Sequence, residues 1–102
     1  MQRVLKFKVD KQVIKKEGDF SGIVKGSQGY LAAEFSFSPD WSGCKVVASF
    51  FIAEQEHPIP INNRRCMIPD EVLTGDYFRV QVVGMKNNQI IKTNKVLVRQ
   101  EG

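Results

Sequence analysis

Apolar and polar side chains alternate with a period of two along most informative segments of this 102-residue chain. Near the N-terminus, Leu5, Phe7 and Val9 share one face of an extended strand, whereas Lys6 and Lys8 lie on the other. The other segments with this alternation are residues 30–37 and 77–84. Such a pattern is typical of antiparallel strands with one face on the core and the other in water. Because no long helical period accompanies it, the alternation restricts the chain to an all-β fold.

Residues 45–53 depart from this alternation, because both faces of the segment KVVASFFIA are largely apolar. Ala48 and Phe50 belong to one set, and Val47 and Phe51 belong to the other. A central strand covered on both sides explains the pattern, and so does a second face that packs on a partner subunit. We therefore predict that Val47 and Phe51 contribute to a protein–protein interface.

Turn-forming residues separate the expected strands at intervals of about 8 to 12 residues. Residues 69–74 are the one helical candidate, since a proline opens this segment and Gly75 follows it. Residues 84–98 indicate a hairpin with its turn at 86–88 and one second strand. We predict a single all-β domain over residues 1–102. Its expected form is an antiparallel, immunoglobulin-like β-sandwich of about seven to nine short strands, with one short helical turn near residues 69–74.

The formal net charge of +4 is concentrated near the N-terminus. Residues 1–16 carry six basic side chains and one acidic side chain, whereas the rest of the chain sums to −1. We expect these lysines to protect the edge and the solvated face of a strand. Lys6, Lys8, Lys15 and Lys16 are also candidates for orienting an acidic partner.

Neither catalysis nor cofactor binding is predicted, because no catalytic, metal-binding or phosphate-binding motif is present. The one histidine, His57, lies beside Pro58 in a polar connection, and Cys44 and Cys66 lack the spacing of a zinc site. We expect both cysteines to be reduced, since the N-terminus does not read as a signal peptide. No apolar run reaches the roughly 18 residues of a membrane-spanning helix. The sequence therefore predicts a non-enzymatic, cofactor-free protein outside the membrane.

Three segments in fixed order carry a resemblance to a known class of proteins. Residues 33–50, AEFSFSPDWSGCKVVASF, combine an alternating strand, an acidic-Trp-Gly corner and a strand that begins with lysine. Residues 61–73, INNRRCMIPDEVL, and 77–98, YFRVQVVGMKNNQIIKTNKVLV, continue the pattern. Over residues 30–98 the chain resembles immunoglobulin-like modules in tail, baseplate or head-fibre proteins of phages and prophages of Gram-positive bacteria. The resemblance implies an architectural role and no catalytic residue.

We accordingly predict a structural or assembly protein of a phage or prophage particle, assembled in the bacterial host cytoplasm. Its expected partners are other virion proteins and further copies of itself. The alternative is a small phage-encoded protein that binds and inhibits a host protein or nucleic acid through its basic N-terminal surface. Nucleic-acid binding is less favoured, because most aromatic residues alternate onto apolar faces. Carbohydrate binding through Tyr30, Trp41 and Tyr77 is weaker still, because we expect Trp41 to plug one end of the sandwich.

Overall fold

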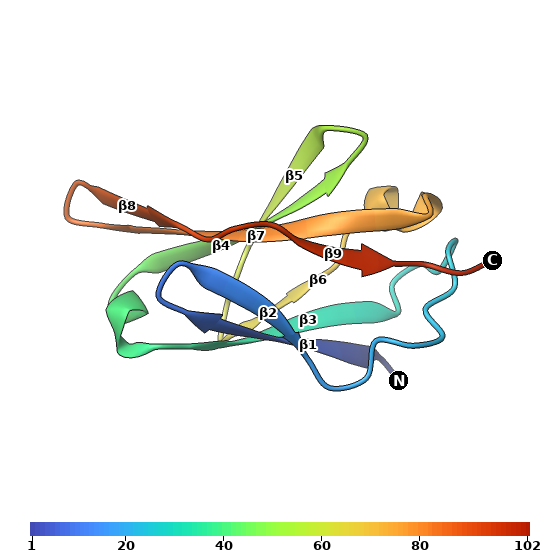
Figure 1. Ribbon diagram of the computed structural model, residues 1–102, viewed down its shortest axis with the longest axis horizontal. Coiled ribbons are helices and arrows are strands. Elements are labelled where there is room, and N and C mark those ends of the chain that lie inside the picture. Colours follow the sequence, from blue (N-terminus) through green and yellow to red (C-terminus); the bar gives the residue numbers. More distant parts are fainter.

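A computed structural model of the chain describes residues 1–102 and contains nine strands and two short 3₁₀ turns (Figure 1). The strands are β1 (Arg3–Asp10), β2 (Val13–Glu17), β3 (Leu31–Phe37), β4 (Lys45–Ile52), β5 (Gln55–Pro60), β6 (Arg65–Met67), β7 (Tyr77–Lys86), β8 (Gln89–Lys92) and β9 (Val96–Arg99). The turns are η1 (Pro39–Trp41) and η2 (Asp70–Thr74). None of the helical segments is long and apolar enough to cross a membrane.

Two sheets pack face to face around one core. The four-stranded sheet has the order β2-β1-β3-β6, and the five-stranded sheet has the order β5-β4-β7, with β8 and β9 paired to opposite ends of β7. This arrangement confirms the predicted all-β architecture of two layered sheets, and the immunoglobulin-like topology stays a prediction. All strand pairs are antiparallel except β1 and β3, which run parallel.

The parallel pair contradicts the expectation of wholly antiparallel sheets. Its physical reason lies in the connection, because the chain leaves β1 through the β2 hairpin and residues 18–30 before it enters β3. A connection of this length can return the chain in the same direction, which a tight turn cannot do. The burial period of two is the same for both orientations, so the sequence pattern did not distinguish them.

The position of β1 also differs from the expectation of an N-terminal edge strand. β1 is internal, with β2 on one side and β3 on the other. The edge strand is β2, and Asn94 covers it. The side-chain Oδ1 of Asn94 accepts a hydrogen bond from the Ile14 backbone amide at 2.8 Å, and the backbone amide of Asn94 donates to the Gln12 carbonyl at 3.1 Å. The edge prediction therefore holds for Lys15 and Lys16 of β2 and is wrong for Lys6 and Lys8 of β1, because Val13–Glu17 form a strand outside β1.

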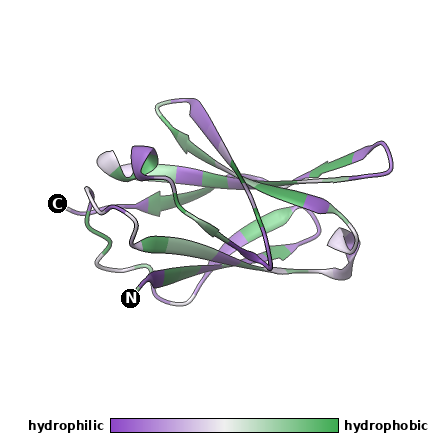
Figure 2. Cartoon of the chain, turned by 180° about the vertical axis from the view of Figure 1, so that it is seen from behind, coloured by the Kyte–Doolittle hydropathy of each residue, from purple (hydrophilic) through white to green (hydrophobic).

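Inward-facing residues of both sheets form the core that the alternation predicts. Leu5, Phe7 and Val9 of β1 are fully buried, as is Phe35 of β3, whose ring stacks on Phe7 with centroids 5.3 Å apart. The facing side of the five-stranded sheet contributes Ala48, Phe50, Phe78, Val80 and Val82, which are all completely buried. Figure 2 shows the resulting alternation of hydrophobic and hydrophilic residues along the strands.

Trp41 closes one end of the sandwich, as predicted. Its ring is 4% exposed, and its Nε1 donates a hydrogen bond to the Lys11 carbonyl at 2.8 Å. The ring lies so close to Gly84 that a Cβ at this position would be 2.7 Å from Trp41 Cζ3. Only glycine permits this approach between β7 and the η1 corner.

The C-terminal hairpin is built differently from its prediction. Its turn is formed by Asn87 and Asn88, both with positive φ, as a two-residue hairpin turn requires. The expected single strand after it is divided into β8 and β9 at Thr93, whose hydroxyl accepts a hydrogen bond from the Val82 amide at 3.0 Å. The predicted helical turn is confirmed as η2, where the buried Gln100 side chain donates to the carbonyls of Val72 and Gly75.

Candidate interaction faces

The predicted interface residues divide between opposite outer faces of the sandwich. Val47 and Phe51 lie on the outward side of β4, in the five-stranded sheet, and both are half-buried. Lys6, Lys8 and Lys15 lie on the outward side of the four-stranded sheet and are exposed. These residues therefore cannot form one continuous surface. We call the two surfaces the five-stranded face and the four-stranded face.

Lys16, the remaining candidate, belongs to neither surface. It lies on the inward side of β2, in register with Phe7, and its ammonium is 5.6 Å from the centroid of the Phe20 ring. Such a contact between a cation and an aromatic ring is weakly favourable at an exposed site. Lys16 therefore covers part of the open end of the core and does not add to the charge of the four-stranded face.

Charges on the four-stranded face largely neutralise one another. Lys6 lies in register between Glu17 of β2 and Glu34 of β3. Glu34 also accepts a hydrogen bond from Arg65 Nε at 2.9 Å. The outward charged residues of these strands are Lys6, Lys8, Lys15 and Arg65 against Asp10, Glu17 and Glu34. Four positive and three negative groups leave a small net charge of +1.

One part of the four-stranded face is not neutralised. Lys8 lies directly opposite Lys15, and its partner on the other side is the uncharged Ser36. Together with Asp10 and Lys11, these two lysines line an open groove. Like charges directly opposite each other on neighbouring strands are unfavourable. The Lys8–Lys15 pair is therefore the part of the predicted N-terminal basic surface that keeps an unbalanced charge.

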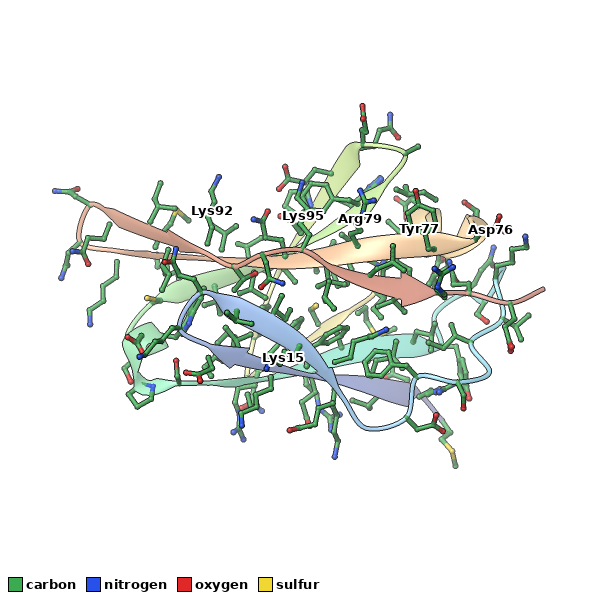
Figure 3. All side chains as sticks on the ribbon, in the orientation of Figure 1. Lys15, Asp76, Tyr77, Arg79, Lys92 and Lys95 are labelled. Atoms are coloured by element: carbon green, nitrogen blue, oxygen red, sulfur yellow. The ribbon has the colours of Figure 1, made fainter.

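The five-stranded face has apolar side chains at its centre and basic side chains around them. Val47 pairs with Val83, and Phe51 lies in the row that contains Arg79 and Leu97. The outward basic residues of this sheet and its connections are Lys45, Arg79, Lys92, Lys95 and Arg99. Figure 3 shows Arg79, Lys92 and Lys95 along this sheet, while Lys15 lies on the other one.

Carboxylates barely offset this positive charge. Glu56 is the one acidic residue on the outward side of the strands of this sheet, and it accepts a hydrogen bond from the Ser49 hydroxyl. Glu54 lies in the turn between β4 and β5. Asp76 precedes β7 at the end of the sheet and pairs with Lys25 at 2.7 Å. The hydrogen bond from Lys25, together with its charge, holds the pKa of the Asp76 carboxyl below its usual value. Asp76 is therefore already paired with a cation outside this face.

Sequence reasoning did not identify the cationic surround, because charge was counted along the chain. Residues 17–102 sum to −1, yet most of their carboxylates lie in turns and connections and not on the strands of this sheet. A signal was present: Arg79 alternates with the core residues Phe78 and Val80, and Lys92 with the half-buried Ile91. Sorting charges by strand face, rather than by segment, would have shown the cluster.

Two aromatic rings on this surface have a cation nearby. Lys95 places its ammonium 4.1 Å from the centroid of Phe51, and Arg79 places its guanidinium 5.6 Å from that of Tyr77. Tyr77 is 45% exposed, whereas Trp41 is buried. Neither Phe51 nor Trp41 therefore offers the open ring that stacking on a base or a sugar requires.

Residues with potential for catalysis or metal binding are dispersed. No three histidine, cysteine or acidic side chains gather as metal ligands. Cys44 and Cys66 are both free, and burial raises the pKa of the Cys66 thiol to about 12. A thiol with this pKa is not an activated nucleophile. His57 is half-buried on the inward side of β5, opposite Phe50.

Comparisons with known proteins give no family for the chain, since no family model, curated protein or solved structure matches it. The function must therefore be argued from the two faces themselves. Of these, the five-stranded face has the more exposed apolar side chains, Met85 and Ile90, and the larger excess of positive charge.

Proposed function

We propose that this chain is a non-enzymatic protein–protein interaction module that binds its partner through the five-stranded face. The observation that carries the proposal is the half-exposed apolar centre at Val47, Phe51 and Val83. On the strands, four cations and one hydrogen-bonded carboxylate surround it, and Lys95 adds a fifth cation from the β8–β9 connection. Apolar groups that stay accessible inside a polar rim are typical of protein-binding surfaces. On the four-stranded face, the outward apolar row of Val4, Ala32 and Met67 lies beside opposite charges that meet in register, so it is not surrounded by unpaired cations.

The outer edge of β5 is poorly suited to pair with an added strand, so a partner is more favourably bound on the face of the sheet. The Ile61 amide donates to the Val46 carbonyl at 3.0 Å, so the alternate positions, Pro58 and Pro60, direct their backbone nitrogens away from the sheet. Proline has no N–H to offer an incoming strand. Two outward prolines therefore block this edge, as natural sheets do to prevent unwanted pairing.

We further propose that the partner belongs to a phage or prophage particle. Support for this step comes from the sequence resemblance over residues 30–98, and the architecture of two packed sheets is compatible with it. Self-association through the five-stranded face is disfavoured, since a two-fold contact would bring two sets of five cations together. Association with further copies, which the sequence predicts, would have to use another surface.

The alternative, inhibition of a host protein or nucleic acid through the basic N-terminal surface, has one observation in its favour. Lys8 and Lys15 keep an unbalanced positive charge beside an open groove. However, Lys6 is flanked by Glu17 and Glu34, and Lys16 covers an aromatic ring. The basic surface is therefore smaller than the sequence suggested, and we prefer the five-stranded face.

Site-specific photo-crosslinking tests the proposal. A photoreactive amino acid would replace Met85, which is 47% exposed on the five-stranded face, in the bacterium that carries the gene. A matched control would carry it at Ser36, exposed on the four-stranded face. We expect Met85 to cross-link to one defined protein in purified particles and Ser36 not to do so. Absence of the protein from particles would contradict the phage assignment, and equal cross-linking from both positions would contradict the choice of face.

A further inference from the structure

One end of the five-stranded face forms a distinct patch, which we call the hairpin patch: Lys45, Val83, Met85, Ile90 and Lys92. Lys45, Met85 and Ile90 lie side by side in one row across β4, β7 and β8, and Val83 and Lys92 are paired in the next row. Ile90 is 65% exposed and Met85 is 47% exposed. The patch thus presents two apolar side chains between two lysines, with no carboxylate in either row.

The hairpin patch is accessible and held in shape. Figure 1 shows the β7–β8 hairpin extending beyond the rest of the sandwich at one end. Its two-residue turn at Asn87 and Asn88 is tight, and the Lys86 ammonium donates a hydrogen bond to the Ser42 carbonyl at 3.0 Å. This contact ties the hairpin to the η1 corner. A surface fixed before binding loses little conformational freedom on association.

We infer that the hairpin patch binds a protein segment that carries apolar side chains flanked by carboxylates; this inference rests on the proposed function and specifies its partner. The exposed Met85 and Ile90 favour an apolar counterpart, because transfer of their surface from water into an apolar contact lowers the free energy. Lys45 and Lys92 require negative charge, which the chain does not supply around them. Apolar burial gives the affinity, and the lysines give orientation and a faster encounter.

A second copy of the chain does not have this chemistry on either outer face. The five-stranded face would oppose its own cations. The four-stranded face has a net positive charge, and the carboxylates beside its apolar row of Val4, Ala32 and Met67 are already in register with Lys6 and Arg65. The partner is therefore a different chain.

A nucleic acid fits the hairpin patch less well than a protein segment does. Binding of single strands combines a cationic groove with aromatic rings on which bases stack. Here the exposed apolar groups are a thioether and an aliphatic side chain. Phe51 is covered by Lys95, and the exposed Tyr77 lies at the opposite end of β7 from the hairpin patch. The observations therefore favour a protein, and an oligonucleotide serves as a competing probe.

Titrations of the ¹⁵N-labelled full chain, followed by NMR, test the inference with four probes. The first is a synthetic peptide in which leucine and glutamate alternate; the second and third replace glutamate by lysine and leucine by serine; the fourth is oligothymidylate. We expect only the leucine–glutamate peptide to shift amide signals of the hairpin patch. Stronger shifts of the same signals by oligothymidylate would overturn the inference in favour of a nucleic acid. Equal binding of the serine–glutamate peptide would overturn its apolar part.

Charge reversal supplies a matched comparison. The double variant Lys45→Glu/Lys92→Glu should bind the leucine–glutamate peptide about tenfold or more weakly, since two favourable charge contacts become repulsive. Lys8→Glu/Lys15→Glu changes the net charge equally on the opposite face and should leave the affinity nearly unchanged. If both double variants weakened binding of the peptide equally, the attraction would depend only on total charge, and the assignment of the site to the hairpin patch would be overturned.

Two further outcomes distinguish the location of the binding site from the chemistry of its partner. Ile90→Ser removes an exposed side chain, so the fold should persist while the affinity for the leucine–glutamate peptide falls. An unchanged affinity would exclude Ile90 from the contact and overturn the inference. If Met85 cross-links to a particle protein but the peptide does not bind, the inferred partner chemistry is wrong while the proposed function stands.

Discussion

The two outer faces of the sandwich are built on similar strands and differ in how their charges are arranged. On the four-stranded face, Lys6 lies between Glu17 and Glu34, so opposite charges meet in register. On the five-stranded face, Lys45 lies beside Met85, and the row ends in the exposed Ile90. One surface is therefore largely satisfied by its own residues, and the other presents groups that only a partner can satisfy.

This difference shows that charge along a chain and charge on a face are separate properties. The most basic segment of the sequence, residues 1–16, contributes β1 and most of β2, two of the four strands of the more neutral face. The remainder of the chain, with a net charge of −1, supplies the more cationic face. The reason is that its carboxylates collect in turns such as η2, whereas the outward strand positions keep lysine and arginine.

The largest expected effect is a difference in stability between substitutions on the inward side and on the outward side of β4. Phe50 is completely buried, so Phe50→Ala should lower the free energy of unfolding by about 3–5 kcal/mol. Phe51 is half-buried on the outer side and covered by Lys95, so Phe51→Ala should cost about 1 kcal/mol. Urea denaturation of both variants measures the difference. A loss from Phe51→Ala as large as that from Phe50→Ala would mean that the five-stranded face serves folding more than binding.

Much of the core could be predicted from the sequence, because burial follows the period of two. Phe7, Phe35 and Phe78 are all inward-facing, and Trp41 closes one end as expected. The direction of β3 relative to β1 could not be predicted, since parallel and antiparallel strands show the same burial pattern. The break after β8 was also hidden, because the Thr93 hydroxyl replaces a backbone group in the hydrogen bonding of β7.

The candidate site was predicted in part. The apolar outer set with Val47 and Phe51 was recognised from β4 alone. Whether Lys6 and Lys8 lie on the same surface as this set could not be predicted without the pairing of strands, and the two groups lie on opposite faces. Which cations join a face depends on which strands become neighbours, and this information is held in long-range contacts and not in any local pattern.

An effect of intermediate size, the reactivity of the two thiols, tests whether the inward side of the four-stranded sheet is as inaccessible to solvent as that of the five-stranded sheet. Cys66 of β6 faces the core and is 9% exposed, whereas Cys44 is half-buried. With a pKa of about 12 against about 8.5 for an exposed thiol, the Cys66 thiolate fraction near neutral pH is lower by about three-thousandfold. A thiol reagent should therefore modify Cys44 in the native protein and Cys66 only after unfolding. Comparable native rates would show that this sheet opens to solvent.

The same thiol gives a pH dependence with a defined sign. Because its folded pKa is the higher one, the unfolded chain loses the proton first as the pH rises. The stabilising contribution is complete below about pH 8.5 and is lost as the pH rises toward 12. Urea denaturation at about pH 7 and about pH 10 should show a smaller decrease in stability for Cys66→Ala than for the parent chain. An identical decrease in both would contradict the closed environment of Cys66.

The smallest effect tests the balance of the four-stranded face itself, and it differs in sign between two neighbouring lysines. Lys6→Glu would place three carboxylates in one row with Glu17 and Glu34, and should lower the free energy of unfolding by about 0.5–1 kcal/mol. Lys8→Glu would oppose Lys15 with a negative charge, and should raise the free energy of unfolding by about 0.2–0.5 kcal/mol. Both changes alter the net charge equally, so each is the control for the other. Thermal denaturation at low and at high salt measures the difference, which salt should reduce. Equal shifts for the two variants would mean that this face responds only to total charge, and the contrast with the five-stranded face would then not depend on register.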